Sequence, residues 1–133
     1  LLPEFTALEN VLMPVEIRYG KISKAAKEKA KEYMKLVGLE AVMNNNSTEM
    51  SGGQQQRTAI ARALINEPKI ILADEPTGNL DSDTTESIYD LMRSINEKFN
   101  TTFIIITHDR RIAEKADRIV EIKDGRINMD IYR

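Results

Sequence analysis

The chain lacks several residue types and patterns, and each absence excludes a class of protein. It contains no cysteine, which excludes disulfide frameworks and thiolate metal sites. No apolar run approaches the roughly 20 residues of a membrane-spanning helix, so we expect any role at a membrane to depend on a partner. The pattern G-x-x-x-x-G-K-[ST], whose backbone and lysine hold phosphates, does not occur in the sequence.

The charge balance gives no basis for nucleic-acid binding. Lysine and arginine number 19 and the acidic residues 21, giving a formal net charge of -2 and a pI near 5.5. Proteins that bind nucleic acid through bulk charge are strongly basic, so we expect no nucleic-acid partner. A length of 133 residues allows one domain with a buried core.

A glycine-rich turn, Ser51-Gly52-Gly53-Gln54, precedes a helical pattern. Ser51 is a good N-cap, and Gln54 stands three residues on, where a capping-box partner belongs. The first N–H groups of the helix have no intrahelical partner and favour anions, phosphate above all. The same residues also suit an ordinary capped helix, so the turn alone leaves both interpretations open.

Two acids follow a short apolar run. The run over 70–73 is typical of a strand buried on both faces of a parallel sheet. Ligands of open α/β sheets bind at the carboxyl ends of strands, where Asp74 and Glu75 would stand. Asp74 could hold Mg²⁺, and Glu75 could act as a general base. Pro76 keeps both acids on a turn. Two solvated acids are the alternative.

A second strand is expected over 102–107, after a helix that Asp81 or Asp83 caps and that ends near Phe99. The strand–helix–strand order predicts a parallel crossover unit. His108, the only histidine, then lies at the same sheet edge as the two acids. A lone histidine is also a common structural hydrogen-bonder. Five apolar residues of the helix are expected to face the sheet: Ile88, Leu91, Met92, Ile95 and Phe99.

The remaining segments are predicted from periodicity and turn residues. Helices are expected over 6–17, where Pro14 should kink or shorten the helix, and over 23–37. The helix after Gln54 should bury three residues: Ile60, Ala63 and Leu64. A short helical turn is expected over 40–43 and a loop over 44–46. Near the C-terminal end, a strand over 119–122 returns through a hairpin at Asp124-Gly125.

Four motifs, in this order and at this spacing, resemble the nucleotide-binding domain of ABC transporters. They are Ser51-Gly52-Gly53-Gln54, the apolar run into Asp74-Glu75, Asn79-Leu80-Asp81, and Thr107-His108-Asp109. The segments 2–11 and 76–81 look most like ATPase subunits of the lipoprotein-releasing and macrolide-export type. The resemblance covers essentially the whole chain.

The resemblance implies an α/β fold, namely part of the P-loop NTPase fold of ABC ATPases. Its expected parts are a mainly parallel sheet with flanking helices, an α-helical subdomain and a C-terminal β-hairpin. Residues 1–50 would form the helical subdomain, and residues 51–133 the signature helix and the C-terminal part of the catalytic core. In this family the phosphate-binding loop precedes these segments, so the chain resembles the C-terminal portion of the domain without its Walker A region.

The resemblance also implies ATP and Mg²⁺ as cofactors, with a role for each matching residue. Asp74 would support Mg²⁺ through water, Glu75 would act as general base, and His108 would contact the γ-phosphate. Five residues would act in trans on ATP bound by a second subunit: Ser51, Gly52, Gly53, Gln54 and Asp81. The implied reaction is ATP hydrolysis coupled to the export or extraction of a substrate.

The implied partners are a second ATPase subunit, forming a homodimer, and a transmembrane permease subunit. The implied location is cytoplasmic, peripheral on the inner face of the cell membrane. Without a phosphate-binding loop, the chain alone is expected to hydrolyse ATP negligibly and to expose an apolar sheet edge. Two alternatives stay open: a fragment of a soluble, non-transport ABC ATPase, and a non-catalytic dimerisation or interaction module.

Overall fold

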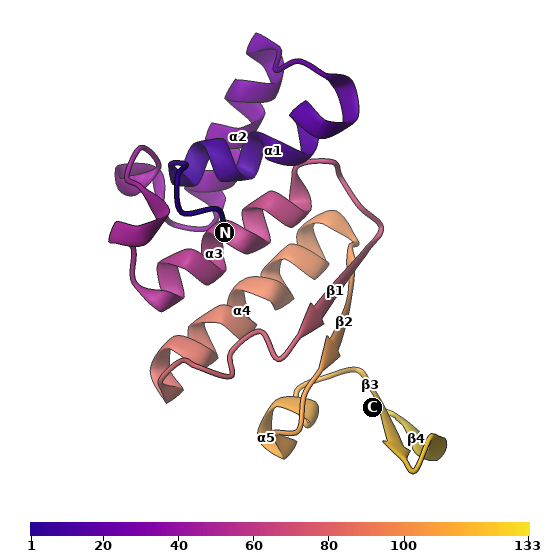
Figure 1. The fold of residues 1–133 in the computed structure, drawn as a ribbon. Coiled ribbons are helices and arrows are strands. Elements are labelled where there is room, and N and C mark those ends of the chain that lie inside the picture. Colours follow the sequence, from indigo (N-terminus) through magenta and orange to yellow (C-terminus); the bar gives the residue numbers. More distant parts are fainter.

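Helices dominate the first half of the chain, and strands appear only in the second half (Figure 1). The computed structural model describes residues 1–133. The helices are α1 (Ala7–Tyr19), α2 (Lys24–Leu36), α3 (Gly52–Leu64), α4 (Ser82–Phe99) and α5 (Arg110–Ala113), with 3₁₀ turns at Glu40–Val42 and Ser47–Glu49. The strands are β1 (Ile70–Asp74), β2 (Thr102–Ile106), β3 (Arg118–Lys123) and β4 (Arg126–Tyr132).

Helix α1 begins at the predicted cap and continues past its proline. Thr6 Oγ1 accepts a hydrogen bond from the Glu9 amide at 3.2 Å, and Glu9 Oε2 accepts one from the Thr6 amide at 2.8 Å. Of the two effects predicted for Pro14, a kink or a shortening, the shortening is wrong, because α1 runs to Tyr19. A proline inside a helix removes one hydrogen-bond donor and crowds the carbonyl four residues earlier, but packing of α1 against α3 and α2 keeps the remaining turns in place.

The three N-terminal helices bury a shared core against one another. Its fully buried members include Val11 of α1, Met34 of α2 and Ala61 of α3. The expectation for Ala63 is wrong: Ala63 is exposed, and Ala61, two residues earlier, faces the core. The 3₁₀ turn at Ser47–Glu49 lies in a stretch for which the sequence predicted no helical turn.

Helix α4 joins the helical group to the strands (Figure 1). Of the two residues predicted as its cap, Asp81 is the N-cap, and the helix buries Ile88, Leu91, Met92 and Ile95 as predicted. Phe99 does not face the sheet. It is 40% exposed, and its ring meets that of Tyr33 on α2 edge to face at 6.0 Å, because the last turn of α4 extends beyond the strands to the helical group.

Strands β1 and β2 pair in parallel, from Ile70 opposite Thr102 to Asp74 opposite Ile106, which confirms the crossover unit. The prediction of strands buried on both faces is wrong. Ile71 is 8% exposed, whereas Leu72 is 74% exposed. Successive side chains of a strand point to opposite faces, and only one face of this pair is covered, by α4.

The C-terminal hairpin is confirmed. Strands β3 and β4 pair antiparallel and form a sheet separate from β1 and β2. Asp124 and Gly125 both have positive φ, 50° and 73°, as a tight two-residue hairpin turn requires. The chain is therefore an α/β domain with a helical group, a parallel strand pair and a hairpin, as expected. None of its helices combines the length and apolarity needed to cross a bilayer.

Candidate functional site

The two acids and the histidine lie at one edge of the parallel pair. β1 ends at Asp74, and the amide of Glu75 donates to the carbonyl of Ile106 at the end of β2, at 2.9 Å. Nδ1 of His108 lies 2.6 Å from Oε1 of Glu75, and the His108 amide donates to the same oxygen at 3.0 Å. The predicted convergence of these residues at one sheet edge is confirmed.

The carboxylate of Glu75 is held on both of its oxygens. The hydroxyl of Thr107 donates to Oε2 at 3.4 Å and accepts from the Asp109 amide at 3.1 Å. The hydrogen bond with the His108 ring is the main cause that lowers the pKa of Glu75 below its usual value. Glu75 is therefore an anion at neutral pH, in a fixed orientation, which is the state required of a general base.

Asp74 lies on the other face of the strand pair. It is exposed and stands opposite Ile106, on the face away from α4. No group of three metal-binding side chains surrounds it. Mg²⁺ is usually held by one or two carboxylates, completed by water and substrate phosphates, so a single accessible Asp74 suits that ion as a partial ligand.

The Ser51 turn has the predicted capping box. Ser51 Oγ accepts from the Gln54 amide at 3.2 Å, and Gln54 Oε1 accepts from the Ser51 amide at 3.0 Å. The two glycines between them pack against their own chain. A Cβ on Gly52 would lie 3.1 Å from the side chain of Leu80, and one on Gly53 only 2.6 Å from that of Thr84. A larger residue at Gly53 would therefore require the Thr84 side chain of α4 to move.

Asp81 lies in sequence between Leu80 and Thr84, the two residues whose side chains approach the glycines of this turn. Its Oδ1 accepts from the Thr84 amide at 2.9 Å, and its Oδ2 from the Thr84 hydroxyl at 2.8 Å. These two bonds cap α4 and lower the pKa of Asp81. The structure therefore brings the candidate residues into two groups. Asp74, Glu75 and His108 form the strand rim, and 51–54 with Asp81 form the second group, which we name the helix-start cluster.

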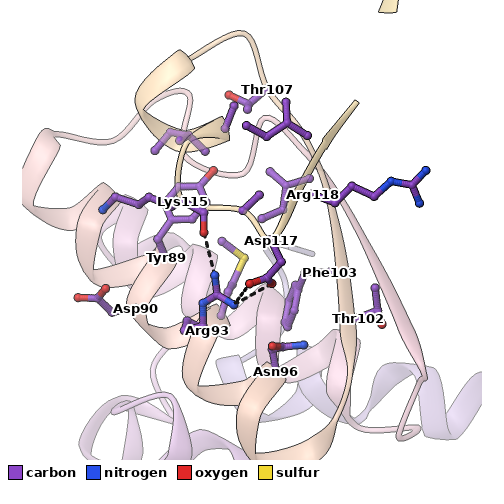
Figure 2. A pocket seen from close by; sticks show the side chains of 16 residues that line it. Tyr89, Asp90, Arg93, Asn96, Thr102, Phe103, Thr107, Lys115, Asp117 and Arg118 are labelled. Carbon is purple, nitrogen blue, oxygen red and sulfur yellow. Dashed lines mark hydrogen bonds and ion pairs between the residues drawn. The ribbon is translucent and has the colours of Figure 1, made fainter. Parts of the chain in front are cut away.

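A cavity of about 390 Å³ lies between α4, β2, α5 and β3, and no member of either group lines it (Figure 2). Among its lining residues, Arg93 of α4 pairs with Asp117 and donates to the carbonyl of Lys115, as the dashed lines in Figure 2 show. Tyr89 also lines it, and burial of its hydroxyl raises the pKa of that group.

Sequence reasoning assigned no role to Thr107. This residue fixes Glu75 through its hydroxyl. A hydroxyl residue directly after a strand, two positions before an acid, is typical of a local side-chain-to-backbone bond, and that signal was available in the sequence. Tyr89 gave no such signal, because an aromatic residue on the buried side of a helix is ordinary core.

The fold is that of ATP-binding cassettes, within the class of P-loop NTPases. A dimeric structure of the cassette MJ0796, bound to ADP and Pi, matches 99% of this chain and 58% of its own with a TM-score of 0.82 at 44% identity. The ADP conformation of MJ1267, a cassette of an ABC transporter, matches 99% of this chain and 57% of its own with a TM-score of 0.90 at 27% identity.

Residues 1–78 match the profile of the ABC transporter family, and the chain belongs to that family. Among its relatives is the lipoprotein-releasing system ATP-binding protein LolD of Syntrophotalea carbinolica, 53% identical over 127 residues. LolD of Anaeromyxobacter dehalogenans is 49% identical over 130 residues. The alignments cover 96% and 98% of this chain but 56% and 54% of those relatives, so the chain spans about half their length.

Proposed function

We propose that this chain is part of an ATP-hydrolysing subunit of an ABC transporter that powers the release of lipoproteins through a membrane partner. One observation carries the proposal: an anionic Glu75 bonded to His108 at the carboxyl ends of two parallel strands. The names of the LolD relatives support the lipoprotein as substrate.

In this proposal ATP and Mg²⁺ are the cofactors, and the strand rim carries the chemistry. Mg²⁺, when bound, neutralises charge on the phosphates. Asp74, exposed at the end of β1, would help to hold that ion, with water completing its coordination. Glu75 orients the attacking water and accepts its proton, and Thr107 and the His108 amide keep its carboxylate in place. The exposed ring of His108 is free to contact the γ-phosphate.

The helix-start cluster acts on a second subunit. Ser51, Gly52, Gly53 and Gln54 present the N-terminus of α3 to ATP bound by a homodimeric partner, and Asp81 lies at the boundary between the two sites. A helix N-terminus favours phosphate. The dimeric state of the MJ0796 cassette supports this assignment.

Residues 1–50 act as the helical subdomain and face the transmembrane permease, and residues 51–133 belong to the catalytic core. The subunit is cytoplasmic and peripheral on the inner face of the membrane.

The decisive experiment is an ATPase assay of the complete subunit, meaning this chain with whatever sequence adjoins it in its gene. Glu75→Gln should lower Mg²⁺-dependent kcat by about 10²–10⁴-fold, the usual contribution of a general base, while ATP binding persists. Glu97→Gln, which neutralises another acid far along α4, is the matched control and should retain activity. The 133-residue chain alone should show negligible turnover, since it has no G-x-x-x-x-G-K-[ST] sequence. Undiminished turnover of Glu75→Gln would contradict the proposal.

A further inference from the structure

Gln55 comes directly after the Ser51–Gln54 turn, and its side chain forms hydrogen bonds with the segment that precedes the turn. Its side-chain Nε2 donates to the carbonyl of Ser47 at 3.0 Å and to that of Met50 at 3.2 Å. Its backbone amide also donates to the carbonyl of Ser51, at 2.9 Å. One side chain therefore joins the first turn of α3 to the backbone on the other side of the Ser51 cap.

The carbonyl of Ser47 is a fixed anchor. Ser47 is 3% exposed, although it lies in a connecting segment. Its hydroxyl donates to the carbonyl of Leu2 at 2.9 Å, and its amide donates to the carbonyl of Phe5 at 3.2 Å. Through Ser47, Gln55 therefore ties α3 to the beginning of the chain, because Ser47 bonds Leu2, 45 residues before it in sequence.

Asn10 of α1 holds that beginning in place. It is fully buried, and its Oδ1 accepts from the Leu2 amide at 2.8 Å. Its Nδ2 donates to the carbonyls of Leu2 at 3.1 Å and Thr6 at 3.0 Å. A buried amide with its partners satisfied is rigid, because breaking any of these bonds leaves a polar group without water. Asn10, Leu2 and Ser47 form a platform under the Ser51 turn.

We propose that Gln55 is a positioning residue: it fixes the direction in which the Ser51–Gln54 turn presents the N-terminus of α3, by holding the turn on this platform. The inference rests on the proposed function, in which that terminus meets the phosphates of ATP in a partner subunit. The capping box is independent of Gln55, so α3 forms without its side chain. What is lost is the alignment of the turn, and small misalignments of a phosphate-contacting group slow a phosphoryl transfer.

The test compares Gln55→Met with Gln56→Met in the complete subunit. Methionine keeps the length of glutamine and removes its donors, and the side chain of Gln56 makes no hydrogen bond in this structure, so the two variants differ only in the bonds at issue. Gln55→Met should lower kcat about tenfold while the KM for ATP stays close to that of the wild type. Its Tm should fall moderately, because the carbonyls of the buried Ser47 and Met50 lose their donor. Gln56→Met should match the wild type in all three.

A double-mutant cycle with Ser51→Ala separates positioning from general damage to the fold. If Gln55 acts through the turn, the double variant should lose little more kcat than Ser51→Ala alone. Additive losses, equal kcat in the Gln55 and Gln56 variants, or a fall in Tm without a fall in kcat would each overturn the positioning role. A wild-type subunit that does not hydrolyse ATP would instead refute the proposed function on which this inference rests.

Discussion

The helical group and the strand pair differ in how completely they bury their apolar side chains. Val11, Met34 and Ala61 of the helices are 0% exposed, whereas Leu72 of β1 is 74% exposed. Three helices can surround a common core, because each turns one face toward the other two. Two strands cannot do so, because α4 covers one of their faces and the other stays open. Apolar sequence alone therefore predicts a strand but not whether both of its faces are covered.

The open face of the strand pair is continuous. Four large side chains, each about half or more exposed, contribute to it: Ile70, Leu72, Ile104 and Ile106. Asp74 lies at its end. The sequence led us to expect an apolar sheet edge; the structure shows an open face as well. Such a surface is typical of one that associates with another chain or another segment.

Removing a helical core side chain is expected to give the largest effect. Met34→Ala should lower the free energy of unfolding by about 2–5 kcal/mol, because truncating this fully buried side chain leaves a cavity in the helical core. Urea unfolding of this chain followed by circular dichroism measures the change. Lys35→Ala, one residue on and exposed, is the control and should stay near the wild type. A loss well below this range would show that the helical core is loosely packed.

The sequence predicted the elements that depend on local signals. The Thr6, Ser51 and Asp81 caps, the Asp124-Gly125 turn and the strand–helix–strand unit were all found where short-range rules placed them. The meeting of Glu75 with His108 was predictable as well, because parallel strands end at the same sheet edge.

Features that depend on distant packing were not predictable. Ala61 rather than Ala63 faces the core because of how α3 lies on α1, and Phe99 meets Tyr33 because α4 extends beyond the strands. The hydrogen bonds from Gln55 to Ser47 and Met50 join two segments, and the pattern of apolar residues does not predict that these segments lie close together. In each case the partner lies in another segment of the chain, and local patterns carry no information about it.

A smaller effect on the free energy of unfolding is expected at the strand rim, where polar contacts and not a buried core hold the ends of β1 and β2. The hydrogen bond from His108 holds the pKa of Glu75 below its unfolded value, so this contact stabilises the fold fully above the usual glutamate pKa of about 4.3. Its contribution is lost as pH falls through the lowered pKa. The stability difference between the wild type and Glu75→Gln should therefore shrink between neutral and acidic pH.

An NMR titration of the Glu75 carboxyl in the wild type and in His108→Ala tests the cause directly. The pKa of Glu75 should rise toward its usual value in the variant, because the largest lowering contact is gone. An unchanged pKa would mean that Thr107 and the backbone hold the anion without the ring.

The smallest effect is expected on the open face. Leu72→Ala should change the free energy of unfolding by no more than about 0.5 kcal/mol at low protein concentration, because a side chain that is already exposed loses little burial. Any association through this face would add a stabilisation that grows with concentration, and the cost of the substitution would then grow with it. Unfolding measured over a range of protein concentrations separates the two cases. A large, concentration-independent cost of Leu72→Ala would mean that the face is covered within the chain itself, and the contrast between the helices and the strand pair would no longer hold.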